Sequence, residues 1–133
     1  MGFYDISRRL VVGNRDTFAI PFVISHHVPI EGETFVFTIR RVLETTKRMG
    51  RPPEKGDILF QQTITTSQLN PIRDEDGVIR SCYFHVTATK EEAALIPEGM
   101  NAYDLACVNA DGGTEIELIP PSEFIVGEVL RYE

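Results

Sequence analysis

Short stretches in which apolar and polar residues alternate recur along the chain, and residues typical of turns separate them. The clearest examples are DTFAIPFVI and ETFVFTIRRV. A two-residue period places their apolar side chains on one face of each strand: Phe18, Ile20, Phe22, Ile24, Phe35, Phe37 and Ile39. Helical periodicity is nearly absent. Such a chain buries its apolar faces by packing sheet on sheet, which predicts an all-β fold.

The middle of the chain repeats this pattern. GDILFQQTI and GVIRSCYFHVT each place three apolar residues in phase: Ile58, Phe60 and Ile64 in the first, and Cys82, Phe84 and Val86 in the second. SQLNPIRDEDG lies between them, and its Asn-Pro and Asp-Gly pairs predict a loop. Pro21 removes a donor from the ladder of its strand, which predicts an edge strand or a bulge there.

A short helix is predicted after the GVIRSCYFHVT strand. Thr89 and Glu92 match the capping box, and Pro97 and Gly99 end the helix after one or two turns. Two apolar residues at its end are expected to close one end of the core: Leu95 and Ile96. A helix this short can cross between sheets but cannot support a helical bundle.

The last third of the chain predicts two paired strands and a closing strand. NAYDLACVN places Tyr103, Leu105 and Cys107 on one face, and Asp111-Gly112 suits a hairpin turn before TEIEL. The pair Pro120-Pro121 cannot continue a ladder, so we expect FIVGEVL to bend across to another sheet edge. The whole chain, residues 1–133, is expected to form a single β-sandwich of six to eight antiparallel strands with one short crossover helix.

Gly99 and Tyr103 lie where the chain leaves this crossover. Their spacing resembles the tyrosine corner of immunoglobulin-like sandwiches, in which the phenol bonds to upstream backbone. We therefore predict a structural role for Tyr103 in preference to contact with a ligand. Asp104 is expected to face the opposite way.

Charge argues against two classes of partner. The formal net charge is −7, which repels phosphate backbones and anionic lipid. No apolar run is long enough for a membrane-spanning helix, and the sequence MGFYDISRRL lacks the features of a signal peptide. Cys82 and Cys107 are expected to be reduced, although a disulfide across the sandwich stays open.

Two motifs suggest metal ligands, but their spacing fits poorly. The acidic run from Arg73 to Gly77 lacks the distal glutamate of a helix-loop-helix calcium site, so it is better interpreted as a solvated hairpin loop. His26 and His27 are neighbours and would point to opposite faces of a strand. We find no nucleophile elbow, no Cys-His pair with a base and no phosphate loop, and we expect no metal, cofactor or catalytic residue.

One segment is basic within this acidic chain, and it is predicted to be a loop that docks on an acidic partner. Its positive residues are Arg40, Arg41, Lys47, Arg48, Arg51 and Lys55. The Gly-Arg-Pro at its centre loosely resembles a hook that enters the minor groove of DNA. Because this is one short match, we favour a protein partner over nucleic acid.

The order of these elements resembles the N-terminal immunoglobulin-like β-sandwich domain of phage baseplate upper proteins and related tail modules of phages and prophages. The likeness rests on the early strands, on KEEAALIPEG, on NAYDLACVNADGG and on the closing FIVGEV, and it covers nearly the whole chain. It implies a non-enzymatic tail or baseplate component without a cofactor, which forms homo-oligomers and contacts other tail proteins. It also implies the bacterial cytoplasm during assembly and then the virion.

Two other functions remain open at this stage. A carbohydrate-binding or cell-surface-binding module can share the same architecture, because fold does not fix function. Such a module needs an exposed aromatic platform, and the chain contains no Trp and four Tyr. An enzyme would need a pocket with convergent polar groups, for which the sequence offers no indication.

Overall fold

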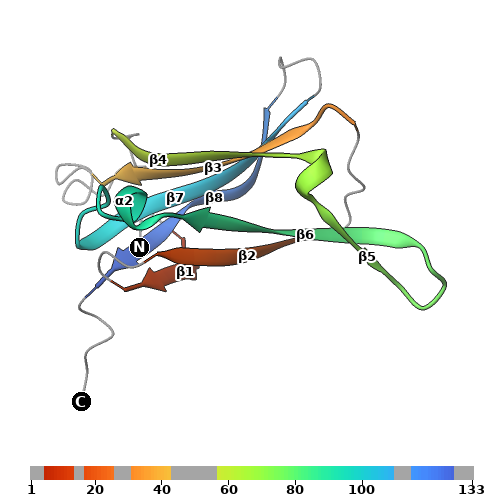
Figure 1. Cartoon of the computed structure of the whole chain (residues 1–133), viewed down its shortest axis with the longest axis horizontal. Coiled ribbons are helices and arrows are strands. Elements are labelled where there is room, and N and C mark those ends of the chain that lie inside the picture. Colours follow the sequence, from red (N-terminus) through yellow and green to blue (C-terminus); the bar gives the residue numbers. More distant parts are fainter. Residues whose placement is uncertain (1–4, 14–16, 26–30, 43–56, 110–114, 128–133) are drawn as a thin grey trace.

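The computed structural model describes residues 5–13, 17–25, 31–42, 57–109 and 115–127 (Figure 1). Eight strands lie within these ranges: β1 (Asp5–Val12), β2 (Phe18–Ser25), β3 (Thr34–Arg41), β4 (Ile58–Thr65), β5 (Asn70–Arg73), β6 (Ile79–Ala88), β7 (Gly99–Val108) and β8 (Glu115–Val126). A 3-10 turn, η1 (Thr66–Gln68), follows β4, and the short helix α2 (Lys90–Ala93) joins β6 to β7. For the described residues, the prediction of an all-β chain with one short crossover helix is confirmed.

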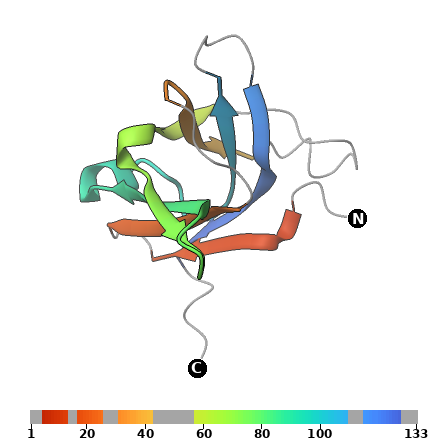
Figure 2. The same cartoon turned by 90° about the vertical axis from the view of Figure 1, so that its right-hand side faces the viewer.

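The strands form two sheets that face each other across the core (Figures 1 and 2). One sheet has five strands in the order β1-β8-β7-β3-β4, and the other has three in the order β2-β6-β5. This is the strand order of a variable-type immunoglobulin sandwich, with β2, β6 and β5 in the smaller sheet and α2 at the corner before β7.

One strand pair departs from the expected antiparallel arrangement. β1 runs parallel to β8, with Val11 beside Ile125 and Val12 beside Val126, and the N–H of Gly127 donates to the carbonyl of Val12 at 2.8 Å. A parallel pair needs a long connection, and here the rest of the domain provides it. Apolar alternation contains no information on strand direction, so the sequence could not reveal this pairing.

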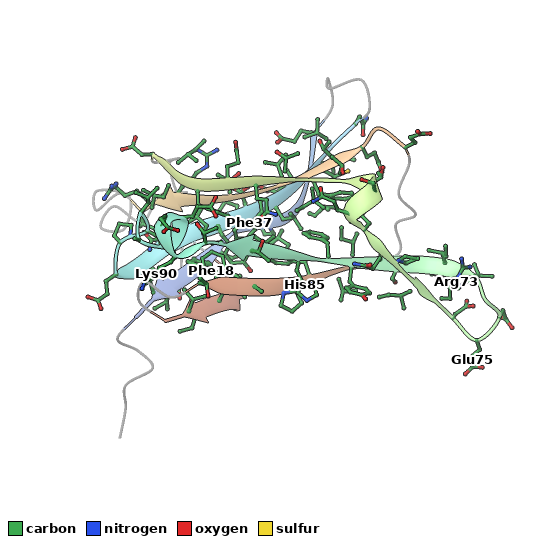
Figure 3. The ribbon with its side chains drawn as sticks, viewed as in Figure 1. Phe18, Phe37, Arg73, Glu75, His85 and Lys90 are labelled. Atoms are coloured by element: carbon green, nitrogen blue, oxygen red, sulfur yellow. The ribbon has the colours of Figure 1, made fainter. Side chains whose placement is uncertain are left out.

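The core lies between the sheets and is rich in phenylalanine. The predicted inward faces of β2, β3, β6 and β7 are confirmed, because their apolar residues form one buried cluster. Phe37 lies near its centre, with its ring centroid 5.5 Å from that of Phe22, 6.1 Å from that of Phe60 and 5.6 Å from that of Tyr103 (Figure 3). The aromatic rings therefore join the two sheets directly.

Two apolar residues expected in the core lie outside it. Ile58 is 50% exposed, because the register between β3 and β4 shifts near Ile39 and places it on the outer face. At the end of α2, Ile96 is buried as predicted, but Leu95 is 67% exposed. A helix of four residues presents only one narrow face to the core, and Ala93 and Ile96 occupy it.

The segment predicted as a loop between β4 and β6 contains structure. Residues 66–68 form η1, and Asn70–Arg73 form β5, which pairs with β6.

The prolines of β8 give a second correction. β8 runs through Pro120 and Pro121 without leaving its sheet and pairs with β7 on both sides of them. Register shifts near Leu105 accommodate the lost donors, so the strand does not bend across to another sheet.

The corner between α2 and β7 is held by side-chain bonds to the backbone. The predicted capping box is confirmed: the N–H of Glu92 donates to Thr89 Oγ1 at 3.1 Å, and the N–H of Thr89 donates to Glu92 Oε1 at 2.8 Å. Asn101 is buried and donates through Nδ2 to the carbonyl of Pro97 at 2.9 Å. Gly99 begins β7 with a φ of +104°.

Replacing Gly99 by alanine is expected to lower the free energy of unfolding by about 1–2 kcal/mol. A Cβ at this position would meet no atom within 4 Å, so the cost comes from the positive φ alone. Chemical denaturation of both proteins measures the difference. Gly99→Asn is the matched variant, and it should lose less because asparagine tolerates positive φ better. Equal stability of Gly99→Ala and the parent would contradict the role of this corner.

Candidate interaction surfaces

The predicted basic loop falls mostly outside the described residues. Lys47, Arg48, Arg51 and Lys55 all lie in the undescribed range 43–56. Arg40 and Arg41 end β3. The side chain of Arg40 lies on the outer face of the five-stranded sheet, where its Nε is 4.0 Å from Asp104 Oδ2. Arg41 is exposed, and its backbone N–H donates to the carbonyl of Asp57 at 2.9 Å.

A shallow groove of about 310 Å³ crosses this outer face. It is lined by Val36, Thr38, Arg40, Gln61, Asp104, Ala106, Glu115 and Glu117. Gln61 Nε2 donates to Thr38 Oγ1 at 3.1 Å, and Asp104 faces outward as predicted. Among its described residues, the lining contains no thiol and no histidine. Alternation in TEIEL places Glu115 and Glu117 on one face of their strand. The sequence therefore did contain a signal for the acidic end of the groove.

A two-stranded ribbon projects from the sandwich beyond the other strands (Figures 1 and 3). We call residues 70–81 the arm: they comprise β5, the turn after it and the start of β6. All four residues of β5 are exposed. The arm also exposes two aliphatic side chains, those of Ile72 at 39% and Val78 at 45%. Neither face of β5 is therefore covered by the core.

The turn of the arm is held by the side chain of Asp74. Its Oδ1 accepts from the N–H groups of Asp76 at 2.9 Å and Val78 at 3.0 Å, and Arg80 Nε donates to its Oδ2 at 2.6 Å. These bonds, that of Arg80 first and that of Val78 second, lower the pKa of Asp74 below its ordinary value. The acidic run thus forms a hairpin turn, as predicted, and the part of the chain that the structure describes contains no cluster of metal ligands.

The described residues on the outer face of the three-stranded sheet include no Asp, Glu, Lys or Arg. The register places Val23 beside Tyr83 and Pro21 beside His85, and the rings of Tyr83 and His85 are 6.1 Å apart. Figure 3 labels His85 on this sheet. We call this surface the neutral face. Its described members are Ala19, Pro21, Val23, Asn70, Ile72, Ser81, Tyr83, His85 and Thr87. Among the described residues, Tyr83 contributes the one exposed aromatic ring of tyrosine or phenylalanine.

The two cysteines are free and buried. Cys107 Sγ lies 3.7 Å from Oε2 of the buried Glu33. Burial, the negative charge of Glu33 and this bond raise the pKa of Cys107 from 9.0 to about 11. Burial, and then the charge of Glu33, also raise the pKa of Cys82. Both groups therefore remain thiols at neutral pH and are not prepared to act as nucleophiles.

Tyr103 lies in the core, with its ring among those of Phe22, Phe37 and Phe124. The side-chain bond across the corner before β7 comes from Asn101. The sequence analysis did not single out this asparagine, although a polar residue just after a helix stop is a position where such bonds are common. The role of the Tyr103 hydroxyl in the corner stays a prediction.

The fold defines the class of the protein as an all-β, immunoglobulin-like sandwich. Comparison of the chain with protein-family models and with curated proteins found no match. None of the described helices is long and apolar enough to cross a membrane.

Proposed function

We propose that this chain is a non-enzymatic structural protein of a phage or prophage tail or baseplate, and that it works through contacts with other tail proteins. The observation that carries the proposal is the arm, a ribbon that exposes aliphatic side chains and is nevertheless ordered. An isolated two-stranded ribbon is marginally stable in water. The bonds of Asp74 brace the turn of this ribbon, and a preformed turn lowers the entropy lost when a partner binds.

The charges of the arm favour a basic protein surface as its partner. Asp74 is paired with Arg80, and Arg73 Nη1 donates to the carbonyl of Gly77 at 2.9 Å. Glu75 and Asp76 are exposed at the end of the arm (Figure 3). Carboxylates beside exposed Ile72 and Val78 suit an apolar contact bordered by lysine or arginine. The proposal that the partner is another tail protein rests on the resemblance to baseplate domains.

Mass spectrometry of virions tests the proposal. Particles would be purified after prophage induction from the strain that carries the gene, and we expect several copies of the chain in each particle. Val78→Glu should reduce incorporation at least fivefold, whereas Leu95→Glu, at a more exposed aliphatic position away from the arm, should incorporate normally. Absence of the chain from particles, while it is abundant in the lysate, would overturn the tail assignment.

A carbohydrate-binding module is not advanced as a second function. It would need several exposed tyrosine, phenylalanine or tryptophan rings on one surface, and among its described residues the neutral face offers one, that of Tyr83, beside the imidazole of His85.

A further inference from the structure

We infer that the neutral face is the surface through which two copies of this chain pack against each other, sheet on sheet, about a twofold axis. The inference goes beyond the proposed function and does not depend on it. Val23 is 61% exposed at the middle of this face and lies beside Tyr83 in the register. Exposed aliphatic and aromatic side chains without charge are typical of the buried centre of protein interfaces.

The distribution of charge over the molecule favours a second copy of this chain as the partner of the neutral face. The chain has a net charge of −7, so two copies repel each other. The other described surfaces carry charges: Glu115 and Glu117 at the groove, Glu91 and Glu92 on α2, and Glu75 and Asp76 on the arm. A basic partner would be drawn to those surfaces. A copy of the same chain can approach closely where no carboxylates meet, and an interface between identical faces must be complementary to itself.

The edges of the three-stranded sheet favour packing by the face. β2 and β5 are its two edge strands, and each contains a proline, Pro21 in β2 and Pro71 in β5. Proline has no N–H to donate to an added strand, and natural sheets use it to block edge-to-edge pairing. A further strand is therefore disfavoured at either edge, and the exposed face is left as the surface for association.

The size of the face predicts a weak dimer. β2, β6 and β5 have 8, 10 and 4 residues. With strands about 4.8 Å apart and about 3.3 Å for each residue, the face covers roughly 350 Å² on each copy. Stable interfaces bury about 800 Å² for each partner. We therefore expect a dimer that dissociates on dilution. Packing of the two faces at about 10 Å would enclose Val23, Tyr83 and His85 between them.

Sedimentation equilibrium of the purified chain from about 1 μM to 1 mM tests this inference. The parent should form dimers within this range, and the dimer should strengthen as salt screens the repulsion between copies. Val23→Glu and Val23→Lys should each weaken the dimer at least tenfold, since either charge would be buried without a partner. Leu95→Glu is the matched control at another exposed aliphatic position, and it should leave the dissociation constant within twofold.

Three results would overturn the inference. The first is a parent that stays monomeric up to about 1 mM, and the second is a dimer that survives both Val23 substitutions. The third is a dimer that Leu95→Glu weakens as strongly as Val23→Glu does. Circular dichroism shows whether each variant is folded. Because Val23 is 61% exposed, its substitution does not disturb the core. Failure here would leave the virion measurement unaffected, so the two proposals are separable.

Discussion

Replacing Phe37 by alanine is expected to lower the free energy of unfolding by about 3–5 kcal/mol. Phe37 is fully buried on β3, and its ring contacts those of Phe22, Phe60 and Tyr103. These neighbours come from both sheets, so the cavity left by the ring would lie between the layers. Closing that cavity would require the two sheets to approach each other, which the other core side chains between them oppose, so little collapse is expected. Urea denaturation followed by circular dichroism measures the loss.

Phe18→Ala is the matched control for this variant. Phe18 is half-buried and contacts the rings of Phe60 and Phe124 at one end of the core, so its loss should cost less. Phe37→Leu keeps most of the side-chain volume and should lose less stability than Phe37→Ala. The leucine variant therefore still gives a measurement if the alanine variant does not fold. A loss below about 1 kcal/mol for Phe37→Ala would contradict the central place of this ring.

The core could be predicted from the sequence because it depends on a local signal. Alternation alone assigns Phe35, Phe37 and Ile39 to one face of β3, and the structure buries all three. The capping box of α2 is equally local, since it needs only Thr89 and Glu92 at the right spacing. Where residues within one short segment determine a structural feature, that feature can be predicted from the sequence alone.

Apart from Leu95 at the end of α2, the misses depend on a second segment. Ile58 has the correct phase for the core, but the register shift between β3 and β4 turns it outward. Asn70–Arg73 contains turn residues and becomes a strand because β6 extends far enough to pair with it. Pro120 and Pro121 remain within β8 because shifts in its pairing with β7 absorb their missing donors. Pairing partners cannot be read from either strand alone.

The candidate surfaces were only partly visible for the same reason. Alternation shows that Pro21 and Val23 face away from the core, and separately that Tyr83 and His85 do. Only the pairing of β2 with β6 brings them together into one neutral face. The arm was hidden because β5 was predicted to be loop. For the basic segment, the described residues place Arg40 beside Asp104, and the docking role of that segment stays a prediction.

Raising the pH from 9 to 11 is expected to remove up to about 2–3 kcal/mol of stability through Cys107 alone. In the folded chain the pKa of Cys107 is raised from 9.0 to about 11, by burial and by Glu33. Below pH 9 the thiol keeps its proton in both the folded and unfolded states, so its contribution is constant. Between pH 9 and 11 the unfolded chain releases the proton while the folded chain retains it, so unfolding becomes easier as pH rises.

The measurement is the free energy of unfolding against pH for the parent and for Cys107→Ala. Other groups also titrate in this range, but they do so in both proteins, and the difference between the two curves isolates Cys107. We expect that difference to be flat up to pH 9 and then to shift against the parent. Glu33→Gln should leave the onset near pH 9, which the unfolded chain sets, and should make the total loss smaller, because removing the negative charge that opposes the thiolate lowers the pKa of Cys107 in the folded chain. Parallel curves from pH 8 to 11 would show that neither burial nor Glu33 holds the proton on Cys107.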